Sequence, residues 1–149
     1  MIFMTESEIR NLFEQWVDAW NSNDTERIRP FYGEDVVLYQ APVKKTLVGV
    51  DHIIARGKDL FEMSEDARLT VRKLHVAGDT AIMELNIAGI HTGRFLDYEP
   101  TGRKFDIDSC LIFKVKDGKI IKHTTYLDTA TIVRALGLLT IPGVRPEAA

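Results

Sequence analysis

The stretch KFDIDSCLIFKVKDGKIIKHTTYLD, residues 104–128, contains the pattern that decides the fold. Polar and apolar residues alternate from Lys104 to Lys116, and a second apolar run extends from Ile120 to Tyr126. Asp117-Gly118-Lys119 separates the two runs, and aspartate-glycine between apolar runs is among the strongest short-range signals for a β-hairpin. This part of the chain is therefore predicted to be two antiparallel strands.

A second predicted hairpin precedes the first. Leu69, Val71 and the segment 74–76 follow a period of two, Gly78-Asp79 supplies the turn, and a strand runs from Thr80 to about His91. Residues 92–103 contain proline and glycine and are expected to form a connecting loop.

The N-terminal half has the spacing of helices. Thr5 and Glu8 form a capping box before apolar residues at three- and four-residue steps. A short second helix is expected from Asp24 to about Tyr32, and Pro30 keeps it brief. A strand over residues 35–40 follows, then a helix over residues 51–61, and a last short helix runs from about Asp128 to Leu136. The predicted fold class is α+β, a curved, mainly antiparallel sheet wrapped around three to four helices.

Composition limits the classes of function. The 149 residues suit one domain spanning 1–149, whose tail over 140–149 has two prolines and no periodicity. Because 22 acidic and 19 basic residues are mixed along the chain, nucleic acid is not an expected partner. The single Cys110 excludes an intrachain disulfide. No signal peptide or membrane span is visible, so a cytoplasmic protein without membrane contact is expected. The four histidines lack the spacing of a metal triad, so no metal is expected.

Several segments together resemble the SnoaL-like polyketide cyclases of the nuclear-transport-factor-2-like superfamily, which also contains ketosteroid isomerase and limonene epoxide hydrolase. They are Trp16-Val17-Asp18-Ala19-Trp20-Asn21, Gly89-Ile90-His91-Thr92-Gly93, Pro100-Thr101-Gly102-Arg103, Asp117-Gly118-Lys119-Ile120, and Tyr126-Leu127-Asp128 with Leu136-Gly137 behind it. The resemblance implies a cone-shaped fold with an internal apolar pocket. A shared fold does not identify a reaction.

Asp128 matches an acid or base of the cyclases and epoxide hydrolases. The flanking Tyr126 and Leu127 suggest a partly apolar setting, which would raise the carboxyl pKa toward neutrality. The alternative is structural, because an aspartate at the start of the last helix is a favourable N-cap.

Other positions depart from the family patterns. Ser109 and Leu111, which alternation places toward the pocket, stand where the cyclases carry glutamine and histidine. Gln40 stands where the isomerase carries its base, so it is expected to bind a carbonyl or hydroxyl instead. Glu84 and Asn86 resemble a two-apart pair of the epoxide hydrolase without its arginine. Glu84 points into the pocket or pairs with a lysine or arginine across the sheet.

The remaining candidates are histidines and aromatic residues. His91 is expected to orient a substrate or move a proton, or else to be satisfied by solvent at a loop edge. His52 lies at the pocket mouth or on the surface, and His75 and His123 are interpreted as ordinary strand residues. Trp16 and Trp20 are predicted to be core, with Trp20 also in the pocket wall. Tyr39 and Tyr126 are expected to present phenols to the cavity.

Two hypotheses follow. The first is a cofactor-independent enzyme using acid–base chemistry on a small apolar carbonyl compound or epoxide: a cyclase, isomerase, lyase or hydrolase. Its catalytic residues would be Asp128 and His91, and its substrate-binding residues would be Trp20, Gln40, His52, Glu84, Asn86, Ser109 and Tyr126. The second is a non-catalytic module that binds a small apolar molecule or dimerises. A homodimer through the face with Asp106, Asp108, Cys110, Ile112 and Lys114 is expected in either case.

Overall fold

A computed structural model describes residues 3–138 and 142–143. Three α-helices, two 3₁₀ helices and six strands are found in this part of the chain. In chain order they are α1 (Glu6–Asn21), η1 (Thr25–Phe31), β1 (Tyr32–Gln40), η2 (Ala41–Val43), β2 (Lys45–Val48), α2 (Val50–Met63), β3 (Arg68–Ala77), β4 (Thr80–Ile90), β5 (Lys104–Lys116), β6 (Lys119–Leu127) and α3 (Thr129–Ala135).

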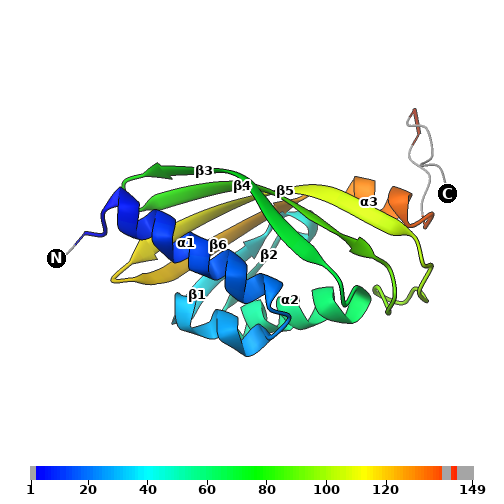
Figure 1. Ribbon diagram of the computed structural model, residues 1–149, viewed down its shortest axis with the longest axis horizontal. Coiled ribbons are helices and arrows are strands. Elements are labelled where there is room, and N and C mark those ends of the chain that lie inside the picture. Colours follow the sequence, from blue (N-terminus) through cyan, green and yellow to red (C-terminus); the bar gives the residue numbers. More distant parts are fainter. Residues whose placement is uncertain (1–2, 139–141, 144–149) are drawn as a thin grey trace.

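The six strands form one curved sheet in the order β2-β1-β6-β5-β4-β3 (Figure 1). β1 and β6 are parallel, and every other neighbouring pair is antiparallel. Both predicted hairpins are present, with Gly78 and Gly118 at positive φ in their turns. The α+β class with a curved, mainly antiparallel sheet is confirmed.

The helices α1 and α2 lie across one face of the sheet, and α3 lies at its far end against β5 (Figure 1). α1 begins at the predicted capping box, in which Glu8 N donates to Thr5 Oγ1 and Thr5 N donates to Glu8 Oε1. Its buried face contributes Phe13 and Trp16, whose rings lie 4.6 and 5.4 Å from the ring of Phe113 on β5. Because these rings are fully buried, they anchor α1 to the sheet.

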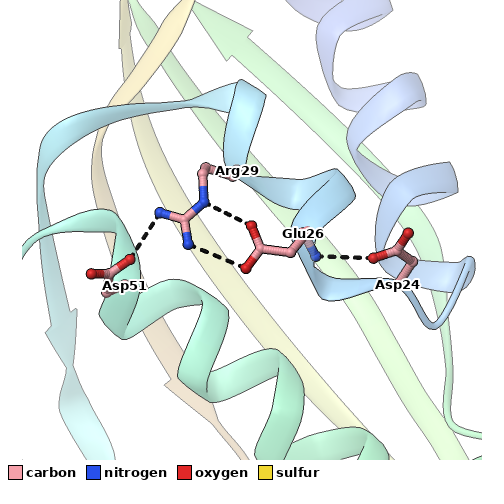
Figure 2. Close-up of polar contacts among 4 residues, drawn as sticks. All are labelled: Asp24, Glu26, Arg29 and Asp51. Atoms are coloured by element: carbon pink, nitrogen blue, oxygen red, sulfur yellow. Dashed lines mark hydrogen bonds and ion pairs between the residues drawn. The ribbon is translucent and has the colours of Figure 1, made fainter.

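The 3₁₀ helix η1 is tied to the start of α2 by one arginine (Figure 2). Arg29 contacts Glu26 at 2.8 Å and Asp51 of α2 at 2.8 Å, and Asp24 caps η1 by accepting from Glu26 N. These exposed pairs contribute little stability, so the packing of apolar groups holds the two elements together. A Cβ at Gly57 of α2 would lie 3.0 Å from Thr25 Cγ2 and 3.4 Å from Trp20 Cζ3, so the close packing of α2 against η1 and α1 favours glycine at this position.

Some boundaries differ from the prediction. The predicted short second helix is present as a 3₁₀ helix over Thr25–Phe31, with Pro30 inside it. β2 was not predicted, since it is a four-residue edge strand that follows a left-handed turn at Lys44. The tail over 140–149 lies outside the described residues apart from 142–143. No helix in the described ranges has the length and apolar character needed to cross a membrane.

Candidate functional site

A cavity of about 460 Å³ lies between the concave face of the sheet and the helices. Its walls are mostly apolar, and they include inward-facing residues of β4, β5 and β6 together with α1, α2 and the loop after β4. The apolar lining residues include Trp16, Trp20, Leu38, Ile53, Met63, Leu69, Leu85, Ile87, Phe105, Ile107, Leu111 and Ile132. A cavity of this size and character fits a small apolar molecule.

His123 of β6 is the buried ionisable group of this cavity. The residue is 5% exposed and lines the cavity, and its Nδ1 lies 2.9 Å from the Tyr32 hydroxyl. Trp16 Nε1 donates to the same hydroxyl at 2.9 Å. Burial lowers the pKa of His123 to about 3 and raises the pKa of Tyr32 well above its ordinary value. Both side chains are therefore neutral at physiological pH.

The mouth of the cavity is charged. Four charged residues line the cavity and are exposed: Arg56, Asp59 and Glu62 of α2, and Arg94 of the loop after β4. Arg56 pairs with Asp59 at 2.9 Å, and Arg94 pairs with Glu99 at 2.9 Å. Glu62 has no ion pair within the described part of the chain. Its carboxylate is therefore the mouth group that is free to act on a ligand.

Asp128 caps α3. Its Oδ1 accepts from Thr131 N at 3.1 Å and its Oδ2 accepts from the Thr131 hydroxyl at 2.6 Å. Asp128 is therefore the N-cap of α3, as the structural alternative for this residue predicts. Asp128 does not line the internal cavity but a shallow depression on the outer face of the sheet, beside Tyr126 and Arg72.

The expectation that Tyr126 faces the cavity is wrong. Counting in twos from buried Ile120 would bring Tyr126 inward, but β6 has a bulge at Ile121. A bulge inserts one residue and reverses which side chains face each side. His123, Thr125 and Leu127 consequently face the cavity, and Tyr126 is 47% exposed on the outer face. Tyr39 is absent from the lining as well, because Leu38 is the inward residue of β1.

Glu84 and Asn86 also lie on the outer face. The inward positions of β4 are Met83, Leu85 and Ile87, so the alternating residues point away from the cavity. Glu84 Oε2 lies 2.9 Å from His75 Nε2, which lowers the Glu84 pKa and confirms cross-strand pairing, with a histidine in place of the expected lysine or arginine. Asn86 donates to Asp106 at 3.0 Å.

His91 is fully buried beside the cavity, not at a solvated edge. Its Nδ1 accepts from Thr101 N at 3.2 Å and lies 2.9 Å from the Thr101 hydroxyl, which fixes the loop over 92–103. Burial lowers its pKa. His91 does not itself line the cavity, but its imidazole packs edge-on against the ring of Phe95, which does. His52 is exposed and does not line the cavity, because it lies in the outer first turn of α2.

Of the predicted substrate-binding residues, Trp20, Gln40 and Ser109 meet in the cavity. The Ser109 hydroxyl donates to Tyr126 O at 2.9 Å and is therefore already engaged. The Gln40 side chain has no hydrogen-bond partner in the part of the chain that the structure describes, so its amide is available to a ligand.

Comparison with known protein families identifies the family of this chain. The model of the SnoaL-like polyketide cyclases matches residues 10–136. The chain belongs to the SnoaL-like polyketide cyclase family. Nogalonic acid methyl ester cyclase of Streptomyces nogalater is 32% identical over 130 residues, which cover 81% of this chain and 91% of that protein.

Solved structures share the fold of this SnoaL-like chain. AclR from Streptomyces galilaeus superposes with a TM-score of 0.84 at 21% identity, covering 95% of this chain and 87% of the other. An epoxide hydrolase of the limonene-epoxide-hydrolase-like type from M. tuberculosis superposes with a TM-score of 0.68 at 16% identity, covering 87% and 90%. At these identities the likeness shows the cone-shaped fold alone.

In this SnoaL-like domain the sequence interpretation missed His123. The sequence predicts only an ordinary strand histidine at this position, because the partner Tyr32 lies 91 positions away and no local motif links the two residues. Strand alternation was the available signal, and the bulge at Ile121 hides it. Glu62 and Arg56 were missed for a different reason, since the exposed face of an amphipathic helix looks the same whether or not it borders a cavity.

Proposed function

We propose that this chain is a small-molecule enzyme that uses acid–base chemistry on an apolar carbonyl compound, with ring closure of a polyketide-type substrate as its reaction and no cofactor. The proposal rests on the arrangement of the cavity. It is an apolar chamber with the neutral imidazole of His123 at its buried end and the unpaired carboxylate of Glu62 at its mouth. Membership of the cyclase family supports the same reaction class.

The chemistry of ring closure requires a proton acceptor and a stabiliser of developing negative charge. A carboxylate removes a proton from a carbon between two carbonyl groups, the resulting enolate carbon attacks a second carbonyl carbon, and the new alkoxide takes the proton back. Glu62 is the proposed base, because it lines the cavity while Asp128 lies behind the sheet. An N–H donor beside the carbonyl oxygen stabilises its negative charge.

A carbonyl substrate fits better than an epoxide. Asp59 and Glu62 are the carboxylates that line the cavity within residues 3–138 and 142–143, and both are exposed at the mouth. Epoxide opening by a pair of buried carboxylates would need an acidic residue among the buried lining side chains. We therefore propose ring closure rather than epoxide hydrolysis as the reaction.

The test is a turnover assay on aromatic polyketide β-dicarbonyl compounds, with nogalonic acid methyl ester among them because a relative is named for it. Ring closure without loss of water changes the absorption spectrum and leaves the mass unchanged. Glu62→Gln should lower kcat at least about a hundredfold if Glu62 is the base, and Asp128→Asn should leave most of the activity. The reverse pattern would return the base to Asp128, and tight binding without turnover in any compound would favour the binding-module hypothesis.

We also propose that the chain forms a homodimer through the outer face of the sheet. Outward positions of β5 carry exposed charged residues toward both ends and half-buried residues at the centre: Lys104, Asp106, Asp108, Cys110, Ile112, Lys114 and Lys116. A two-fold axis near Cys110 and Ile112 would place Asp106 and Asp108 of each copy against Lys114 and Lys116 of the other. Such self-complementarity is what a symmetric interface requires.

A further inference from the structure

We propose that Tyr32 and Trp16 are positioning residues that hold His123 as a neutral Nε2–H donor, aimed at an uncharged carbonyl oxygen of the cavity ligand. The inference rests on the proposed function in taking that ligand to be a carbonyl compound. It adds a role for two residues that do not carry out proton transfer, and it restricts the chemistry of the group bound at the buried end of the cavity.

The hydrogen bonds around Tyr32 determine which group donates and which accepts along the series Trp16, Tyr32 and His123. Indole Nε1 of Trp16 is a donor only, so it must donate to Tyr32 Oη, which it does at 2.9 Å. The Tyr32 hydroxyl has one proton, and the acceptor within reach is His123 Nδ1 at 2.9 Å. If Nδ1 carried the proton instead, it would donate to Oη and leave the hydroxyl proton of a 4%-exposed tyrosine without an acceptor.

This direction sets the tautomer of His123. Nδ1 accepts from Tyr32, so the neutral imidazole carries its proton on Nε2. Nε2 has no hydrogen-bond partner within the described chain, and the side chain lines the cavity while 95% of it is buried. The unused donor is therefore available to a bound molecule rather than to the protein.

Packing holds the ring in this orientation. The imidazole stacks on Tyr32, with ring centroids 5.9 Å apart and planes 11° from parallel, and it meets the ring of Phe113 edge-on at 4.7 Å. Phe113 in turn packs against Trp16. Because each ring contacts the next, the imidazole cannot rotate to exchange its two nitrogens without displacing core aromatic residues.

The ligand class follows from the surroundings of the donor. None of the buried side chains lining the cavity in the described ranges is Asp, Glu, Lys or Arg, so a charged ligand group at this end would lose hydration without gaining a countercharge. The low pKa of His123 keeps the imidazole neutral across the physiological range. A neutral oxygen that acquires negative charge during reaction satisfies both conditions, because it is uncharged on binding and stabilised by the donor afterwards.

The tautomer is tested first, by long-range ¹H–¹⁵N correlation on the full-length chain with ¹⁵N-labelled histidine, using His123→Gln to assign the resonances. We expect an unprotonated Nδ1 and a protonated Nε2 in His123, and a mixture of tautomers in Tyr32→Phe. Tyr98→Phe, an exposed tyrosine outside the cavity lining, is the matched control and should leave the spectrum of His123 unchanged. A protonated Nδ1 in the unaltered chain, or an unchanged tautomer in Tyr32→Phe, would overturn this assignment of donors and acceptors.

Carbonyl recognition is tested with 9-fluorenone and fluorene, two apolar probes of one shape that differ in the carbonyl oxygen. One neutral hydrogen bond predicts that fluorenone binds about fivefold to tenfold more tightly than fluorene. His123→Leu should bring this ratio close to one, and Tyr32→Phe should reduce it while Tyr98→Phe retains it. Equal affinities in the unaltered chain, or no measurable binding of either probe, would overturn the ligand class. If both experiments succeed and no polyketide compound is turned over, the proposed function fails and the donor assignment stands.

Discussion

Acidification is expected to destabilise this protein through one histidine, and the effect is large enough to measure. The folded-state pKa of His123 is about 3, against an ordinary value of 6.5. The unfolded chain therefore binds a proton between these values while the folded chain does not, so stability is full above about pH 6.5 and falls as pH decreases toward 3. From these two pKa values, His123 alone lowers the free energy of unfolding by about 2 kcal/mol between about pH 8 and about pH 5.

Urea unfolding at several pH values measures this contribution. His91 has a lowered pKa through burial, and Glu84 has one through His75, so both also favour higher pH. The matched variant His123→Gln removes only the titration of His123. The difference between the two profiles of unfolding free energy against pH therefore isolates the contribution of this histidine. We expect the variant to lose about 2 kcal/mol less than the unaltered chain over this range. Parallel profiles would refute the assignment of His123 as a buried neutral group.

Three further predictions concern other parts of the chain. Asp128→Ala should lower the free energy of unfolding by about 1 kcal/mol in urea titration, since it removes the cap of α3. Gly93→Ala should cost at least about 2 kcal/mol in the same assay, because a Cβ would lie 1.7 Å from Glu62 O and detach the loop from α2. Ile112→Asp on the outer face should convert a dimer into a monomer in sedimentation velocity, and a monomeric unaltered chain at micromolar concentration would contradict the dimer.

The fold could be predicted largely because its signals are local. The capping box at Thr5 and the turns at Gly78 and Gly118 lie within a few residues of the elements they begin or connect. Alternation in β5 likewise placed Ile107, Ser109 and Leu111 on the inner face, where they line the cavity. The parallel pairing of β1 with β6 has no such local signal, because the strands are separated by most of the chain.

The candidate site was predicted less well because the features that determine it are not local in the sequence. Side chains on regular strands such as β4 and β5 follow a period of two, but the single extra residue at Ile121 reverses the order on β6. This reversal moved His123 into the cavity and Tyr126 out of it. A bulge depends on the partner strand, so the sequence of β6 alone does not reveal which of its faces is buried.

The polar groups of the cavity are divided between its two ends, and this division has a chemical consequence. Charged groups at the mouth keep contact with water, and Glu62 is exposed there. At the buried end the same carboxylate would be desolvated and neutralised, and the protein instead places His123, whose hydrogen bond to Tyr32 satisfies one ring nitrogen and leaves the other for a ligand. A substrate that spans the cavity would thus have one carbonyl beside a neutral donor and an acidic C–H near a base. Ring closure needs this combination, whereas simple storage of an apolar molecule would need neither group.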